Sequence, residues 1–181
     1  MITAAIVALS LQGSAAPAAM QSSLQSVDAN EAVNLFKQIC FDPFPDPAKF
    51  DAVVAASAFG LVKAPETPSE AMQPGDAWYS AKARVTYVNA DWLPRNFGTP
   101  QCSVTVNVGG NPTNADIVNI LINELKLPNA KSSGNAANTL NQWDLPGIGA
   151  DKWRLFARTQ AGLPGGFEAQ FSLLNLRGKK K

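Results

Sequence analysis

The stretch that most constrains the fold of this chain covers residues 101–127. Its first part alternates apolar and polar side chains with the period of a half-buried β-strand. The apolar positions of that alternation are Cys102, Val104, Val106 and Val108. Its second part carries an apolar stripe at helical spacing, formed by Ile117, Ile120, Leu121 and Leu125. A strand with one apolar face that leads into a helix with one apolar stripe predicts a sheet with helices packed on one side.

Composition excludes several kinds of chemistry. The 181 residues contain no histidine, which removes Ser-His and Cys-His catalytic pairs and the usual histidine-containing zinc sites. The net charge of +1 provides no global field that would attract nucleic acid. The sequence also lacks a recognisable catalytic motif. We therefore expect a non-catalytic domain with no cofactor, no metal and no nucleic-acid partner.

The N-terminal residues have the pattern of a signal peptide. Ile2–Leu11 is a mostly apolar run, and Ala16 and Ala18 supply the small residues that precede a cleavage site. The pattern lacks the usual Lys or Arg before the apolar run, and a buried N-terminal helix is the alternative. No other run has the length of a membrane span. We expect an exported protein, periplasmic or secreted, with a signal peptide at 1–18, a flexible segment at 19–27, one domain at 28–177 and a basic tail at 178–181.

The chain has two cysteines, Cys40 and Cys102. In an oxidising compartment an even pair usually forms a structural disulfide. Both residues fall at apolar positions, Cys40 on a helical stripe and Cys102 on the inward side of its strand. We therefore predict a Cys40–Cys102 disulfide. The alternatives are two buried thiols or a redox pair, and the absence of a C-x-x-C motif argues against the redox pair.

The remaining elements follow from capping residues and alternation. Asp28, Asp46 and Thr113 are the expected N-caps of three helices, and residues 78–88 alternate as one strand. Two further strands are expected near 152–158 and 167–173, and residues 129–151 show no regular pattern. The predicted order is α-α-β-β-α-β-β. We expect an α+β fold with a four-stranded, mainly antiparallel sheet and helices packed on one face.

Basic residues gather at the outward positions of the predicted strands, and these are Lys82, Arg84, Lys152, Arg154 and Arg158. If they share one face, that face could bind an anionic polymer of the cell envelope or an acidic partner protein. The alternative is a solvated outer surface on which Lys and Arg prevent unwanted edge pairing.

Two tryptophan–aspartate pairs form a second candidate site. They are Asp91–Trp92 and Trp143–Asp144, both in segments expected to be loops. If the loops meet, they would form a groove able to stack a sugar ring, with the two carboxylates that glycoside hydrolysis requires. The alternative is that both tryptophans anchor long loops to the body of the protein.

Two features resemble a group of small exported bacterial proteins of unknown function. One is a helix that carries Phe-x-x-x-Cys, here Phe36–Cys40, and the other is a second cysteine on a later strand, here Cys102. The resemblance implies export and a disulfide and assigns no functional residue. The sequence thus predicts an exported, non-enzymatic domain that binds a partner protein or an anionic envelope component through a basic sheet face. A module that binds or acts on glycans through the Trp/Asp loops is the alternative.

Overall fold

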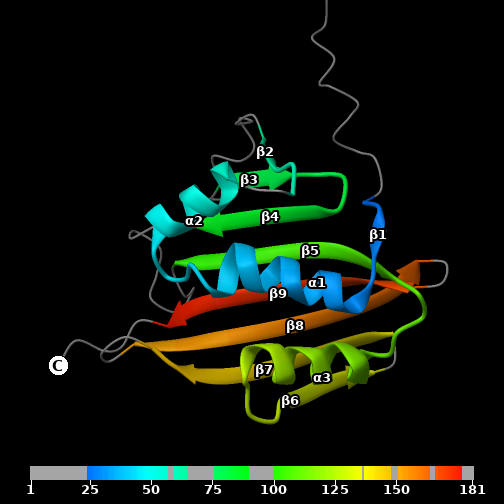
Figure 1. Ribbon diagram of the computed structural model, residues 1–181. Helices are drawn as coiled ribbons and strands as arrows, with labels where there is room; N and C mark the ends of the chain where they lie inside the picture. The colour runs from blue at the N-terminus through cyan, green and yellow to red at the C-terminus, as the bar shows by residue number, and fades with distance from the viewer. Residues whose placement is uncertain are drawn as a thin grey trace, which may run out of the picture.

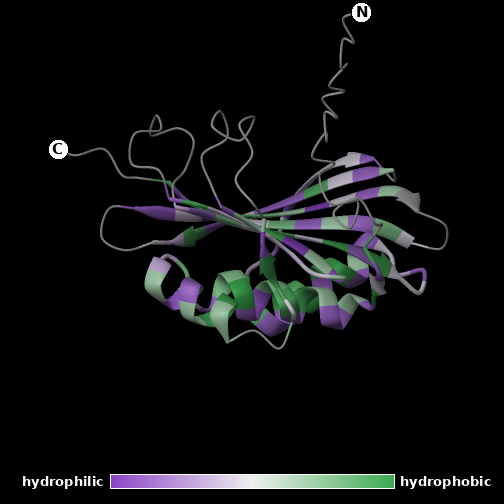
Figure 2. Cartoon of the chain, turned by 90° about the horizontal axis from the view of Figure 1, so that it is seen from above, coloured by the Kyte–Doolittle hydropathy of each residue, from purple (hydrophilic) through white to green (hydrophobic). Residues whose placement is uncertain are grey.

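The computed structural model describes residues 24–56, 59–64, 76–89, 100–135, 137–147, 151–163 and 166–176. In these residues nine strands form one large sheet, and three α-helices lie on one of its faces (Figure 1). Seen from above, the helical layer lies entirely on one side of the sheet (Figure 2). None of the helices in this described part is both long and apolar enough to cross a membrane.

The helices begin where their capping residues predict. Helix α1 spans Ala29–Phe36 and continues as a π-helical turn, η2, over Lys37–Phe41. Helix α2 spans Pro47–Ala55, and α3 spans Asn114–Leu125. Each N-terminus is closed by a short side chain that accepts hydrogen bonds from otherwise unpaired backbone N–H groups. These capping residues are Asp28, Asp46 and Thr113.

The sheet has the order β2-β3-β4-β5-β9-β8-β7-β6. The short β1 lies parallel to β5, beside residues 107 and 108, and all other neighbours are antiparallel. The strands are β1 (Ser26–Val27), β2 (Val62–Lys63), β3 (Asp76–Tyr79), β4 (Ala83–Val88), β5 (Gln101–Gly109), β6 (Lys131–Asn135), β7 (Asn138–Pro146), β8 (Lys152–Leu163) and β9 (Gly166–Leu176).

The sheet has an internal symmetry. Strands β2–β5 and β6–β9 are each a four-stranded antiparallel meander, and their last strands, β5 and β9, pair at the centre of the sheet. Helices α1 and α2 precede the first meander, and α3 precedes the second. Read outwards from the centre, the two halves therefore have the same strand order, although two helices precede the first meander and one precedes the second (Figure 1).

The core lies between the sheet and the helices. Phe36 of α1 packs on Phe171 of β9 with ring centroids 5.5 Å apart, and Phe50 of α2 stacks on Tyr87 of β4 at 4.3 Å. The predicted disulfide is confirmed: Cys40 and Cys102 are bonded, and both are buried. This bond covalently links the helical layer to the central strand β5.

The four-stranded sheet predicted from the sequence is wrong. Strands β6 and β7 occupy residues 131–146, in the stretch without a regular pattern. All five residues of β6 are exposed, so this edge strand has no apolar face to mark it. In β7 the inward residue Asn141 is fully buried and polar, which breaks the alternation. Its amide donates to Asn114 Oδ1 at 2.9 Å and its carbonyl accepts from Ser132 Oγ at 2.7 Å, so the buried side chain is satisfied.

A second correction concerns residues 78–88, which form two strands and a turn instead of one strand. Ser80 Oγ accepts hydrogen bonds from the backbone N–H groups of Lys82 and Ala83, at 3.2 and 3.1 Å. This local bonding of a serine hydroxyl closes a turn between β3 and β4. The inward positions of β4 are as predicted, since Ala83 and Val85 are completely buried. The short strands β1 and β2 were also absent from the prediction, and β1 falls in the segment expected to be flexible.

Candidate functional site

The sheet face opposite the helices, called the open face below, carries most of the predicted basic residues. Residues that are cross-strand partners share a face. On β8, Leu155 and Ala157 are fully buried against the helices, so the alternate positions project from the open face. Lys152, Arg154 and Arg158 occupy those positions. Arg84 on β4 also belongs to the open face, because it lies between the buried Ala83 and Val85.

Lys82 is placed elsewhere. It lies in the turn between β3 and β4, and its Nζ forms a salt bridge with Glu31 Oε1 at 2.6 Å. Glu31 belongs to α1, on the helical side of the sheet. The serine turn at Ser80 ends the alternation that would have directed Lys82 outward. This residue therefore does not contribute to the open face.

Arg84 is separated from the β8 residues by two strands. In one row across the sheet, Arg84 pairs with Thr105 of β5, Thr105 with Gln170 of β9, and Gln170 with Arg158 of β8. Three strand spacings place the backbones of Arg84 and Arg158 about 14 Å apart. The predicted basic face is therefore divided between β4 and β8.

The larger group is a row of outward side chains on β8, which we call the β8 ladder. It consists of Lys152, Arg154, Phe156, Arg158 and Gln160. Successive members are two residues apart, a distance of about 6.7 Å along the strand. Lys152, Arg158 and Gln160 are exposed, and Arg154 and Phe156 are partly exposed. The ladder is thus an accessible line of cations interrupted by one aromatic ring.

Strand β7 positions both arginines of the ladder. Arg154 Nε donates to Asp144 Oδ1 at 2.7 Å, and Arg158 Nε donates to Asn138 Oδ1 at 3.2 Å. Lys131 of β6 also lies 3.4 Å from the Asp144 carboxylate. The hydrogen bond from Arg154 is the main cause that lowers the pKa of Asp144, so this carboxylate stays ionised at neutral pH.

The flank of the open face formed by β6, β7 and β8 is positively charged. Its described outward residues include one carboxylate, that of Asp144, and four cations. The cations are Lys131, Lys152, Arg154 and Arg158. Neither Lys152 nor Arg158 has a salt-bridge partner in the described part of the chain. This flank therefore carries a local excess of positive charge although the whole chain is nearly neutral.

The side chains at the centre of the open face are buried, in contrast to those of the β8 ladder. Ser103 of β5 and Ser172 of β9 are only 3% and 8% exposed. Ser103 Oγ donates to Ser172 Oγ at 2.8 Å, so these hydroxyls already satisfy one another. The larger group of accessible cations on the open face thus lies on the β8 flank, and Arg84 lies apart from it on β4.

The Trp/Asp candidate is not supported on its described side. Trp143 is 1% exposed and its Nε1 donates to the carbonyl of Pro128 at 2.9 Å, on the helical side. Asp144 is the next residue of the same strand and therefore faces the open side. The two side chains point to opposite faces and cannot line one groove. Asp91 and Trp92 lie outside the described residues.

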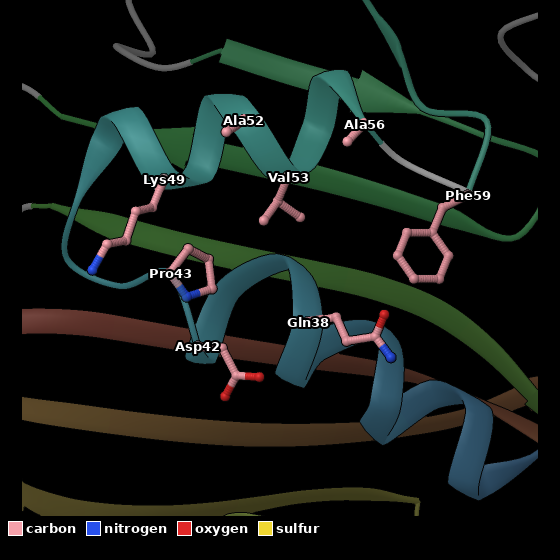
Figure 3. A pocket seen from close by; sticks show the side chains of 8 residues that line it. All are labelled: Gln38, Asp42, Pro43, Lys49, Ala52, Val53, Ala56 and Phe59. Atoms are coloured by element: carbon pink, nitrogen blue, oxygen red, sulfur yellow. The ribbon is translucent and has the colours of Figure 1, made fainter.

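An open groove lies between η2 and α2 on the helical side (Figure 3). It has a volume of about 640 Å³ and an apolar lining that includes Val53 and Phe59. On its rim, Asp42 forms a salt bridge with Lys37 at 2.7 Å. No group of three potential metal ligands occurs among the described residues.

The β7 side chains that hold the two arginines of the ladder could not be identified from the sequence. The pattern Arg154-x-Phe156-x-Arg158 was visible as alternation. The partners Asp144 and Asn138 were not, because β7 itself was not recognised. Comparison with protein-family models, with curated proteins and with solved structures finds no match for this chain.

Proposed function

We propose that this protein is an exported, non-catalytic domain that binds an anionic component of the cell envelope or an acidic partner protein through the open face. The observation that carries the proposal is the β8 ladder. Its cations lie in one line, and Arg154 and Arg158 are held in place by β7. Held side chains lose less conformational entropy when they bind, which favours a binding role over a merely solvated surface.

Two further observations support export. The buried Cys40–Cys102 disulfide is typical of proteins outside the reducing cytoplasm. The signal-peptide pattern at residues 1–18 agrees with that location and lies outside the described residues.

The first test measures retention on an anionic matrix. The double variant Lys152→Gln/Arg158→Gln is expected to bind immobilised dextran sulfate about tenfold more weakly than the wild type, because each exposed charge contact contributes roughly 0.7 kcal/mol. Affinity is measured in a salt gradient, since screening weakens such contacts.

The matched control removes two cations from the helical side, Lys49→Gln/Lys126→Gln. It has the same net charge as the test variant and should elute with the wild type. Equal loss in both variants would mean that binding follows net charge alone, and would contradict the proposed face.

Export is tested by intact mass. We expect the protein purified from the periplasm or medium to begin at Ala19. We also expect its two thiols to react with an alkylating reagent only after reduction, because the disulfide consumes both. An uncleaved chain recovered in the cytoplasm would contradict export.

A further inference from the structure

The two arginines of the β8 ladder are held by β7 in the same way. Asp144 and Asn138 each accept a hydrogen bond from an arginine Nε, at 2.7 and 3.2 Å. The terminal Nη groups of Arg154 and Arg158 have no partner among the described residues. Each guanidinium therefore presents a fixed fork of donors, the arrangement that binds a planar carboxylate through two parallel hydrogen bonds.

The spacing of the forks indicates an extended ligand. Arg154 and Arg158 are four residues apart on one strand, which separates their backbones by about 13 Å. A single small anion is too short to bind both forks. Two anionic groups of one elongated molecule can do so, and Lys152 extends the line of cations at one end.

Phe156 lies between the two forks on the same strand. Its cross-strand neighbours are Gln142 of β7 and Ser172 of β9, and the next row brings Gln170 beside Arg158. Gln142 Nε2 also donates to Asp144 Oδ1 at 3.5 Å. An aromatic ring beside amide side chains suits a sugar ring, because the C–H face of the sugar packs on an aromatic plate while its hydroxyls bond to amide groups.

We propose that the β8 ladder binds a linear acidic polysaccharide. Its carboxylates bind the forks of Arg154 and Arg158, and a sugar unit between them stacks on Phe156. This inference rests on the proposed function and specifies the class of anion.

Two other anionic partners fit the ladder less well. A membrane-binding surface usually inserts apolar side chains, and the one exposed large hydrophobic residue in the described part of the chain is Val62, on the edge strand β2. An acidic protein would supply carboxylates but no sugar ring for Phe156.

The test compares polygalacturonate with polyglutamate, which carries carboxylates on a chain without sugar rings. The full mature protein is titrated with each polymer and with phosphatidylglycerol vesicles. We expect tighter binding to polygalacturonate. Phe156→Ala should weaken that binding about tenfold, because it removes the aromatic surface against which the sugar ring packs, and should leave polyglutamate binding unchanged.

Phe156→Leu is included because Phe156 is partly buried and its truncation to alanine could disturb the fold. Leucine keeps most of the apolar volume without the aromatic plate, so it should lose the same preference for polygalacturonate. Arg158→Lys keeps the charge and removes the fork, and should weaken binding to both polymers several-fold. Lys126→Gln, on the helical side, should leave both affinities unchanged.

Three outcomes would overturn the inference. Equal affinity for the two polymers with no effect of Phe156→Leu, or preferential binding to vesicles, would exclude an acidic polysaccharide while the basic binding face stands. Failure to bind polygalacturonate, polyglutamate and vesicles alike, together with no retention on dextran sulfate, would reject the proposed function as well.

Discussion

Replacing Cys40 and Cys102 together by alanine is expected to lower the free energy of unfolding by about 4 kcal/mol. The disulfide joins residues 62 positions apart, and the loss of loop-closure entropy in the unfolded chain is large for a loop of that size. Both sites are 1% exposed, so the alanines stay buried and leave no polar group unsatisfied. Urea denaturation of the oxidised wild type and of the double variant measures the difference.

The control for this variant is the wild type unfolded in the presence of a thiol reductant. It should approach the stability of the double alanine variant, because the same cross-link is missing in both. An unchanged urea midpoint for the variant would mean that the bond does not restrict the unfolded chain. Binding of the folded variant to dextran sulfate should be unchanged, since the β8 ladder lies on the opposite face of the sheet.

Replacing Trp143 by alanine is expected to destabilise the protein by about 3–5 kcal/mol, the usual cost of removing a large buried aromatic side chain. Trp143 is among the largest fully buried side chains, and its Nε1 holds the carbonyl of Pro128, just beyond the end of α3. Thermal and urea unfolding measure the loss.

The conservative variant Trp143→Phe separates an anchoring role from a sugar-binding role. It keeps most of the buried surface and loses the hydrogen bond to Pro128, which costs about 1–2 kcal/mol. Its affinity for polygalacturonate should equal that of the wild type. A folded Trp143→Phe protein that has lost affinity for saccharides would contradict the anchoring role. It would instead support a sugar-binding role for the Trp/Asp candidate site.

The elements with strong local signals were predictable from the sequence. The strand predicted from the alternation at residues 101–108 corresponds to β5. Its inward residues Val104, Val106 and Val108 are completely buried. Thr113 and Asp116 form the capping box of α3. These features depend on neighbours within a few residues, so periodicity and capping rules suffice to find them.

The candidate site was only partly predictable. The outward positions of Arg154 and Arg158 follow from the alternation of β8. The placement of Lys82 does not, because a hydroxyl of Ser80 turns the chain there. The acceptors that hold the two arginines lie on β7, whose pattern is obscured by the buried Asn141.

By itself, the sequence determined the helix caps, the strands with clean alternation and the pairing of the only two cysteines. The tertiary structure alone decided the nine-stranded sheet, its internal symmetry and the fixed forks of the β8 ladder. The physical reason is that these features depend on partners far apart in the chain. Ser132, Asn114 and Asn141 satisfy one another only after β6, β7 and α3 meet, and an exposed edge strand such as β6 is defined by its neighbour and not by its own side chains.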